Sequence, residues 1–101
     1  ILNPIGFLCQ VETDWSARVI REAKHPVVSI KPLGAGRVLP PTGLGFVYDN
    51  IKPSDTVCIG MLSVEEAAED IEIARACIER REAAIELQRT RSKDVLNVSR
   101  A

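Results

Sequence analysis

The sequence has few of the residues that build metal centres or nucleic-acid interfaces. It contains three cysteines and one histidine among 101 residues, and no cysteines form a C-x-x-C pair, so a zinc or iron–sulfur site is not expected. The formal net charge of -1 argues against a general nucleic-acid binder, because such domains are usually strongly basic. No apolar run approaches the roughly 20 residues of a membrane span, and no signal peptide is recognisable. Widely spaced cysteines favour a reducing, cytoplasmic setting.

The length is sufficient for one small domain and no more. The chain begins at Ile1, inside an apolar run and without an initiator methionine, which indicates a piece of a longer polypeptide. We expect two parts, a structured segment over residues 1–91 and a C-terminal tail over residues 92–101.

Two short apolar runs organise the rest of the chain. They cover residues 27–30 and 56–59, and each is followed by a loop that contains glycine. Between them we expect a stiff, extended loop at Pro40-Pro41 and then a weak helix over residues 43–50. Apolar runs this short around one helix are typical of parallel strands in a βαβ unit. Both loops would then lie at the carboxyl edge of the sheet, where α/β proteins bind ligands.

The N-terminal third predicts one more strand and one helix. Residues 1–8 read as a strand, although its proline removes a ladder donor, so the strand lies at an edge or has an irregular start. Thr13 or Asp14 can cap a helix that ends near Lys24. Trp15 belongs to the apolar stripe of this helix, and we expect it in the core.

The C-terminal third predicts a long helix. Ser63 and Glu66 have the spacing of a capping box, and the helical pattern continues to about Arg91 or breaks near Arg81. The predicted order is therefore βα-βα-βα with three parallel strands. Such crossovers are right-handed. Open edge strands that are rich in apolar residues favour association with another polypeptide.

Several stretches resemble the C-terminal part of the aldo-keto reductases. They are residues 29–36 (SIKPLGAG), 44–47 (LGFV), 56–61 (TVCIGM), 63–66 (SVEE) and 69–70 (ED). In that family the last βα units read roughly as a "PLG.G" loop followed by a "V.PG..S.E...EN" segment. A weaker match places Asn3, Pro4 and Gln10 where an earlier strand carries cofactor-facing polar residues. The resemblance covers residues 1 to about 80 and implies an α/β fold, with three parallel βα units that form part of a (β/α)8 TIM barrel.

The resemblance also implies chemistry, namely carbonyl reduction by an NAD(P)H-dependent oxidoreductase. The family's catalytic Asp, Tyr, Lys and His lie in earlier strands, so none can be placed on this chain, and we expect the chain alone to be inactive. The cofactor-binding end can be carried over. Its residues would be Pro32, Leu33, Gly34, Gly36, Arg37, Gly60, Met61 and Ser63.

The chain departs from the NADP-binding members of that family at its phosphate end. They have a lysine where this chain has Gly60, an arginine where it has Glu66, and an asparagine where it has Asp70. Acidic side chains repel a phosphate. The resemblance therefore implies NADP or NAD as a cofactor, and the residues Gly60 and Glu66 weaken that expectation.

Each candidate loop has a functional and a structural interpretation. The backbone N–H groups of residues 34–36 could cradle a phosphate with Arg37 as a clamp, or the glycines could serve a tight connection. The N-terminus of the last helix is suited to an anion, or it is simply capped by Ser63. Lys31 stands at a strand end and could form a Schiff base if it is buried with a lowered pKa, or it could pair with a carboxylate.

Three functions stay open from the sequence. The first is a phosphate- or cofactor-binding edge of an aldo-keto-reductase-like barrel. The second is a non-catalytic half-barrel that associates through its open strand edges, and the third is a Schiff-base lyase or aldolase that uses Lys31. The expected partners are the remainder of the barrel or another copy of the chain, and a phosphate-bearing small molecule, but neither nucleic acid nor membrane.

Overall fold

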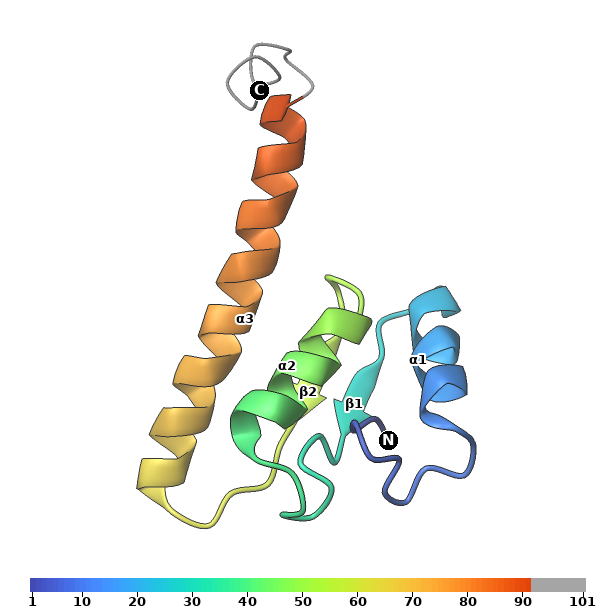
Figure 1. Ribbon diagram of the computed structural model, residues 1–101, viewed down its shortest axis with the longest axis vertical. Coiled ribbons are helices and arrows are strands. Elements are labelled where there is room, and N and C mark those ends of the chain that lie inside the picture. Colours follow the sequence, from blue (N-terminus) through green and yellow to red (C-terminus); the bar gives the residue numbers. More distant parts are fainter. Residues whose placement is uncertain (92–101) are drawn as a thin grey trace.

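The computed structural model describes residues 1–91, and it describes the side chains of residues 1–80. Over this part of the chain three helices alternate with two short strands (Figure 1). The elements are α1 (Thr13–Glu22), β1 (Val28–Ile30), α2 (Pro40–Asn50), β2 (Thr56–Cys58) and α3 (Val64–Arg91).

The two strands form a parallel sheet, as the sequence predicts. Val28 lies opposite Thr56, and Ile30 lies opposite Cys58. A parallel pair needs a crossover connection, and α2 supplies it. Because the strands run in the same direction, the loops after Ile30 and after Cys58 leave the sheet at the same edge, which confirms the predicted arrangement of the two loops.

The predicted partial TIM barrel is wrong, because the described residues form only two strands. Residues 1–8, which were expected to be the third strand, form turns instead. One backbone hydrogen bond, from Leu2 N–H to the Ile30 carbonyl at 3.2 Å, joins this segment to the end of β1. The chain then turns away before a second ladder bond can form.

The side chain of Asn3 explains why no strand forms there. This side chain is fully buried, and its Oδ1 accepts hydrogen bonds from Phe7 N–H at 2.8 Å and Ile5 N–H at 3.3 Å. Its Nδ2 donates to the Phe7 carbonyl at 3.0 Å and the Lys31 carbonyl at 3.1 Å. An asparagine side chain that bonds its own neighbouring backbone competes with a sheet ladder. The same amide fastens the turn to the end of β1.

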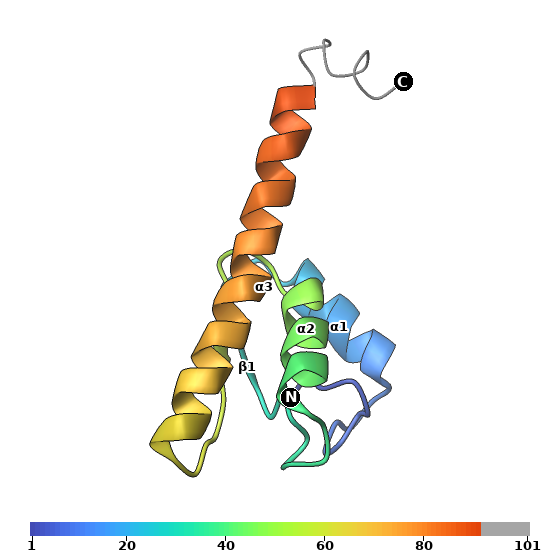
Figure 2. The same ribbon diagram turned by 60° about the vertical axis from the view of Figure 1, so that its left-hand side comes forward.

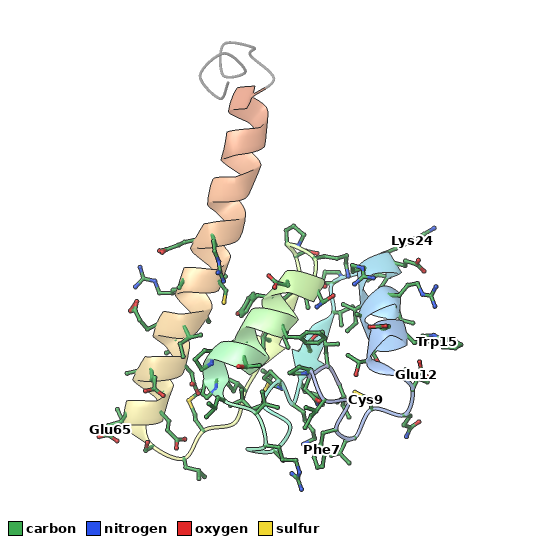
Figure 3. The ribbon with its side chains drawn as sticks, viewed as in Figure 1. Phe7, Cys9, Glu12, Trp15, Lys24 and Glu65 are labelled. Atoms are coloured by element: carbon green, nitrogen blue, oxygen red, sulfur yellow. The ribbon has the colours of Figure 1, made fainter. Side chains whose placement is uncertain are left out.

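The observed α1 differs from its prediction in the face that it buries. The helix occupies almost the expected residues, but its N-cap is Glu12, which makes no side-chain capping bond. Ala17 and Ile20 are buried, whereas Trp15 is 56% exposed and points away from the body (Figure 3). The prediction that Trp15 lies in the core is therefore wrong. Both sides of α1 carry apolar residues, and contact with α2 decides which side is buried.

The observed α2 begins at Pro40, so the prediction of an extended loop at the two prolines is also wrong. Proline is tolerated in the first turn because the first N–H groups of a helix have no partner inside the helix. The first bond of the helix forms beyond the prolines, from Gly43 N–H to the Leu39 carbonyl at 2.9 Å.

The long α3 is continuous to Arg91, with no break near Arg81. Ser63 caps it as predicted, because its Oγ accepts a hydrogen bond from Glu66 N–H at 3.1 Å. The Glu66 carboxylate reaches back and accepts from Leu62 N–H at 2.8 Å. The predicted tail over residues 92–101 lies outside the described residues.

The helices cover one face of the sheet. Figures 1 and 2 show α2 against the strands, with α1 and α3 on either side of it. The core lies between this helical layer and the sheet. It consists of Leu2, Ala17, Ile20, Val47 and Ile51, with Val57 of β2 packed against it. Within the described residues, no helix is both long and apolar enough to cross a membrane.

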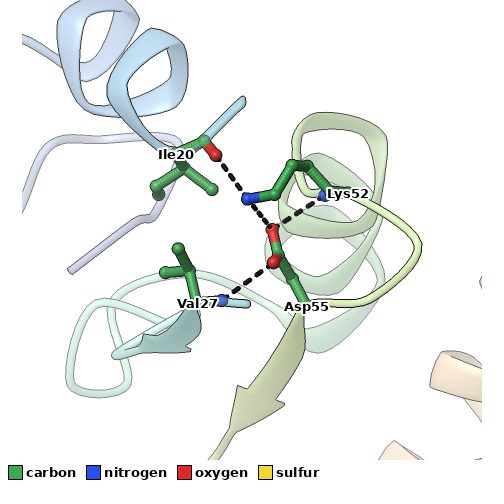
Figure 4. A network of polar contacts seen from close by, with 4 residues as sticks. All are labelled: Ile20, Val27, Lys52 and Asp55. Atoms are coloured by element: carbon green, nitrogen blue, oxygen red, sulfur yellow. Dashed lines mark hydrogen bonds and ion pairs between the residues drawn. The ribbon is translucent and has the colours of Figure 1, made fainter. Parts of the chain in front are cut away.

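A buried carboxylate holds three segments together at the other end of the sheet, namely the end of α1, the start of β1 and the turn before β2 (Figure 4). Asp55 Oδ1 accepts from Val27 N–H at 2.9 Å, and its Oδ2 accepts from Lys52 N–H at 2.9 Å and from Lys52 Nζ at 3.0 Å. Lys52 Nζ also donates to the Ile20 carbonyl at 2.6 Å. Burial by itself raises the pKa of Asp55, but the hydrogen bonds from Lys52 and Val27 outweigh it and hold the pKa below its ordinary value.

Candidate functional site

The predicted site residues fall into two groups at the carboxyl edge of the sheet. Pro32, Leu33, Gly34, Gly36 and Arg37 lie in the loop that follows β1. Gly60, Met61 and Ser63 lie in the loop that follows β2. Parallel pairing brings both groups to the same edge of the sheet, as expected from their positions after the two strands.

The loop after β1 is a tight turn with a left-handed backbone. Lys31, Gly34, Ala35 and Gly36 have φ values of 59°, 58°, 56° and 87°. The turn is closed by hydrogen bonds from Gly34 N–H to the Lys31 carbonyl at 3.1 Å and from Arg37 N–H to the Gly34 carbonyl at 3.2 Å. Glycine adopts these angles without strain. The backbone geometry therefore accounts for the glycines without a ligand.

The Arg37 guanidinium closes the same loop from outside. Its carbon lies 3.9 Å from the centroid of the Phe7 ring, a cation–π distance. Its Nη1 donates to the carbonyl of Gly34 at 3.2 Å and to that of Ala35 at 3.4 Å. The side chain remains exposed, so its other N–H groups can still meet an anion. Sequence reasoning missed Phe7, because nothing in the residue pattern places it under Arg37.

Lys31 does not have the surroundings of a Schiff-base lysine. Its side chain is exposed, whereas such a lysine is activated by desolvation or by a neighbouring cation. Its backbone is strongly constrained, since its carbonyl accepts from both Asn3 Nδ2 and Gly34 N–H. The backbone of Lys31 therefore helps to form the turn. Among the described side chains, Lys31 forms no ion pair.

The loop after β2 uses its polar groups for capping. Ser63 and Glu66 occupy two N–H groups at the start of α3, so the structural interpretation of this segment holds. Gly60 does not have a positive φ, and a Cβ there would meet nothing within 4 Å. The fold of the described residues therefore does not require glycine at this position.

Exposed apolar side chains dominate the surface around these loops. Leu62 is 94% exposed, Val64 81% and Leu39 74%, and Glu65 stands at the same end of α3 (Figure 3). A phosphate site normally presents N–H groups and cations. This edge offers one exposed arginine and one exposed lysine in its first loop and acidic residues beside its second.

The sheet face opposite the helices is also uncovered. Val28 is 62% exposed and Ile30 39%, and Cys58 beside Ile30 is exposed as well. The alternate residues are turned to the helices, because Ser29 is buried and Val57 packs on the core. The sequence signal for this face was present, since consecutive apolar residues in a strand indicate burial on both sides.

The described residues contain no group of three or more His, Cys, Asp and Glu side chains that could hold a metal ion. Comparison with known proteins adds no assignment, because no family model matches the chain and no similar curated protein or solved structure was found.

Proposed function

We propose that this chain is a non-catalytic association module whose open sheet is completed by another polypeptide. The uncovered sheet face carries the proposal. Strands of a parallel sheet are normally buried on both faces, and here Val28, Ile30 and Cys58 are left in contact with water. A contiguous exposed apolar patch marks an interaction site.

The chemistry of the candidate site supports the same proposal. Its polar groups close turns or cap α3, and Lys31 is exposed. The partner is another copy of the chain or the remainder of a longer protein. The three free cysteines, Cys9, Cys58 and Cys77, favour a reducing, cytoplasmic setting for this association.

Replacing Val28 by lysine tests the proposal. We expect the wild-type protein to sediment above the mass of one protomer at micromolar concentration, or to bind a hydrophobic dye strongly. Val28→Lys places a charge on the apolar face and should reduce either signal severalfold without changing the far-UV circular dichroism. Ser54→Lys, at an exposed turn, is the matched control. A wild-type protein of single-protomer mass that binds no dye contradicts the proposal.

A phosphate site in the loop after β1 is the second candidate. The observation that favours it is the pair of backbone N–H groups at Ala35 and Gly36, which make no hydrogen bond among the described residues and lie next to exposed Arg37. Successive N–H groups in a turn can form a concave anion site. The ligand would be a phosphate-bearing small molecule, with NADP or NAD as the cofactors that the family resemblance suggests.

Calorimetric titration with NADPH and with inorganic pyrophosphate tests this second candidate. Saturable binding is expected to weaken about tenfold or more in Arg37→Ala, because a hydrogen bond to a charged group contributes about 1.5–3 kcal/mol. Arg18→Ala, an exposed position on α1, should leave binding unchanged. The absence of saturable heat, or an equal loss in both variants, rules the candidate out.

A further inference from the structure

The edge of β2 that faces away from β1 is open for hydrogen bonding. Thr56 N–H donates to the Val27 carbonyl at 3.0 Å, so Thr56 faces β1. Backbone groups alternate in direction along a strand, and the N–H and C=O groups of Val57 therefore point away from β1. The outer edge of β1 is different, because the Ile30 carbonyl there accepts from Leu2 N–H.

A stripe of apolar side chains runs along α3 and stays partly exposed in the described structure. Val64, Ile71 and Ile78 follow one another at intervals of seven residues, two helical turns, and they are 81%, 57% and 39% exposed. Helices normally bury such a stripe against a neighbour. Here α3 instead packs on α2 along another line, which contains the buried residues Asp70 and Cys77.

Helix geometry shows that this stripe lies on the side of α3 that faces the plane of the sheet. Each residue of a right-handed helix is rotated by about 100° from the one before it, so Ile71 and Ile78 lie about a quarter turn from Asp70 and Cys77. In Figures 1 and 2, α3 lies beside α2 at the β2 side and runs opposite to the strands. Because α3 runs in that direction, the side chains of Ile71 and Ile78 point from the helical layer toward the plane of the sheet. They lie just beyond the open edge of β2.

We infer that the proposed partner contributes one extended strand, added parallel to β2 at this edge and covered by α3. This inference rests on the proposed association and names its site. The stripe of α3 lies where a right-handed crossover helix covers the next parallel strand. Strand addition to an exposed edge is a recurrent mode of peptide recognition, with backbone hydrogen bonds for affinity and side-chain contacts for specificity.

The charges around the site define the chemistry of this strand. The stripe and the open sheet face contain no ionised residue, so the segment that lies on them is uncharged and rich in β-branched residues. Glu65 and Glu72 each follow a stripe residue and are exposed, whereas Glu79, which follows Ile78, is paired with Arg75 at 3.4 Å. The residues that flank the strand should therefore be basic.

A peptide from this chain has that composition. Residues 24–31, Lys-His-Pro-Val-Val-Ser-Ile-Lys, contain the β1 sequence between two lysines, and β1 already pairs with β2 in parallel. We expect the synthetic peptide to bind the full chain saturably. It should slow hydrogen exchange of the Val57 amide about tenfold and shift the methyl resonances of Ile71 and Ile78, whereas a scrambled peptide does neither.

Two lysine variants of α3 complete the test. Ile71→Lys should abolish peptide binding, and Ala76→Lys, on another face of α3, should retain it; both positions are exposed, so the fold is expected to survive. The inference is overturned if Val57 is not protected, or if the peptide displaces β1 and leaves the α3 methyl groups unchanged. In that case, self-association that is still lost in Val28→Lys would leave the proposed function standing without this site.

Discussion

Asp55→Ala is expected to lower the free energy of unfolding by about 3 kcal/mol, because it leaves several buried donors without an acceptor. The carboxylate accepts from the backbone of Val27 and Lys52 and from the Lys52 ammonium. These bonds join the start of β1 to the turn before β2, and Lys52 extends them to the Ile20 carbonyl of α1. Urea unfolding followed by circular dichroism measures the loss.

Asp49→Ala is the matched control, since Asp49 is an exposed carboxylate on α2. It should change the free energy of unfolding by less than about 0.5 kcal/mol. Equal effects of the two substitutions would show that the Asp55 network does not stabilise the fold.

The pH dependence of stability provides a second measurement on Asp55. Its pKa is lowered from the ordinary value of 3.8, so the folded state binds this proton less readily than the unfolded state. The network is therefore fully effective above about pH 4 and is lost as the pH falls through the lowered pKa. Asp55→Asn should make unfolding less dependent on pH in this acid range, and an unchanged acid profile would contradict the assignment.

Gly43→Ala and Gly45→Ala are expected to change stability in opposite directions, although both lie in α2. A Cβ at Gly43 would stand 2.6 Å from the Pro32 carbonyl oxygen and 2.8 Å from Leu33 Cδ2. The oxygen belongs to the backbone of a constrained loop, so α2 must move, and such overpacking costs about 1–3 kcal/mol. At Gly45 a Cβ meets nothing within 4 Å, and alanine should stabilise the helix by up to about 1 kcal/mol.

Thermal and urea unfolding of the two variants side by side measure this difference. The comparison isolates the contacts with Pro32 and Leu33, because helix propensity changes equally in both substitutions. If Gly43→Ala were as stable as Gly45→Ala, α2 would not approach the loop after β1 as closely as the structure indicates.

Local patterns were enough to predict the elements whose cause is local. The capping of α3 by Ser63 and Glu66 depends on residues three positions apart, and it was predicted for that reason. The parallel pairing of residues 28–30 with residues 56–58 followed from two short apolar runs separated by one helix. The glycine turn after β1 was predicted as well, but not its contact with Phe7.

The failed predictions concern residues whose state depends on distant parts of the chain. The apolar residues at the N-terminus suggested a third strand and a partial barrel, but the Asn3 side chain reaches the Lys31 carbonyl 28 positions away and holds a turn instead. Trp15 was expected in the core because it lies on an apolar stripe, yet α2 packs on Ala17 and Ile20.

By itself the sequence determined the helices, the two paired runs and the shared edge of their loops, because hydrogen bonding and periodicity act over a few residues. Only the tertiary structure decided which apolar faces are buried and which remain open, since burial depends on the neighbours that packing brings together. The tertiary structure therefore decided three features: the exposed sheet face at Val28 and Ile30, the open edge of β2 at Val57 and the partly exposed apolar stripe of α3.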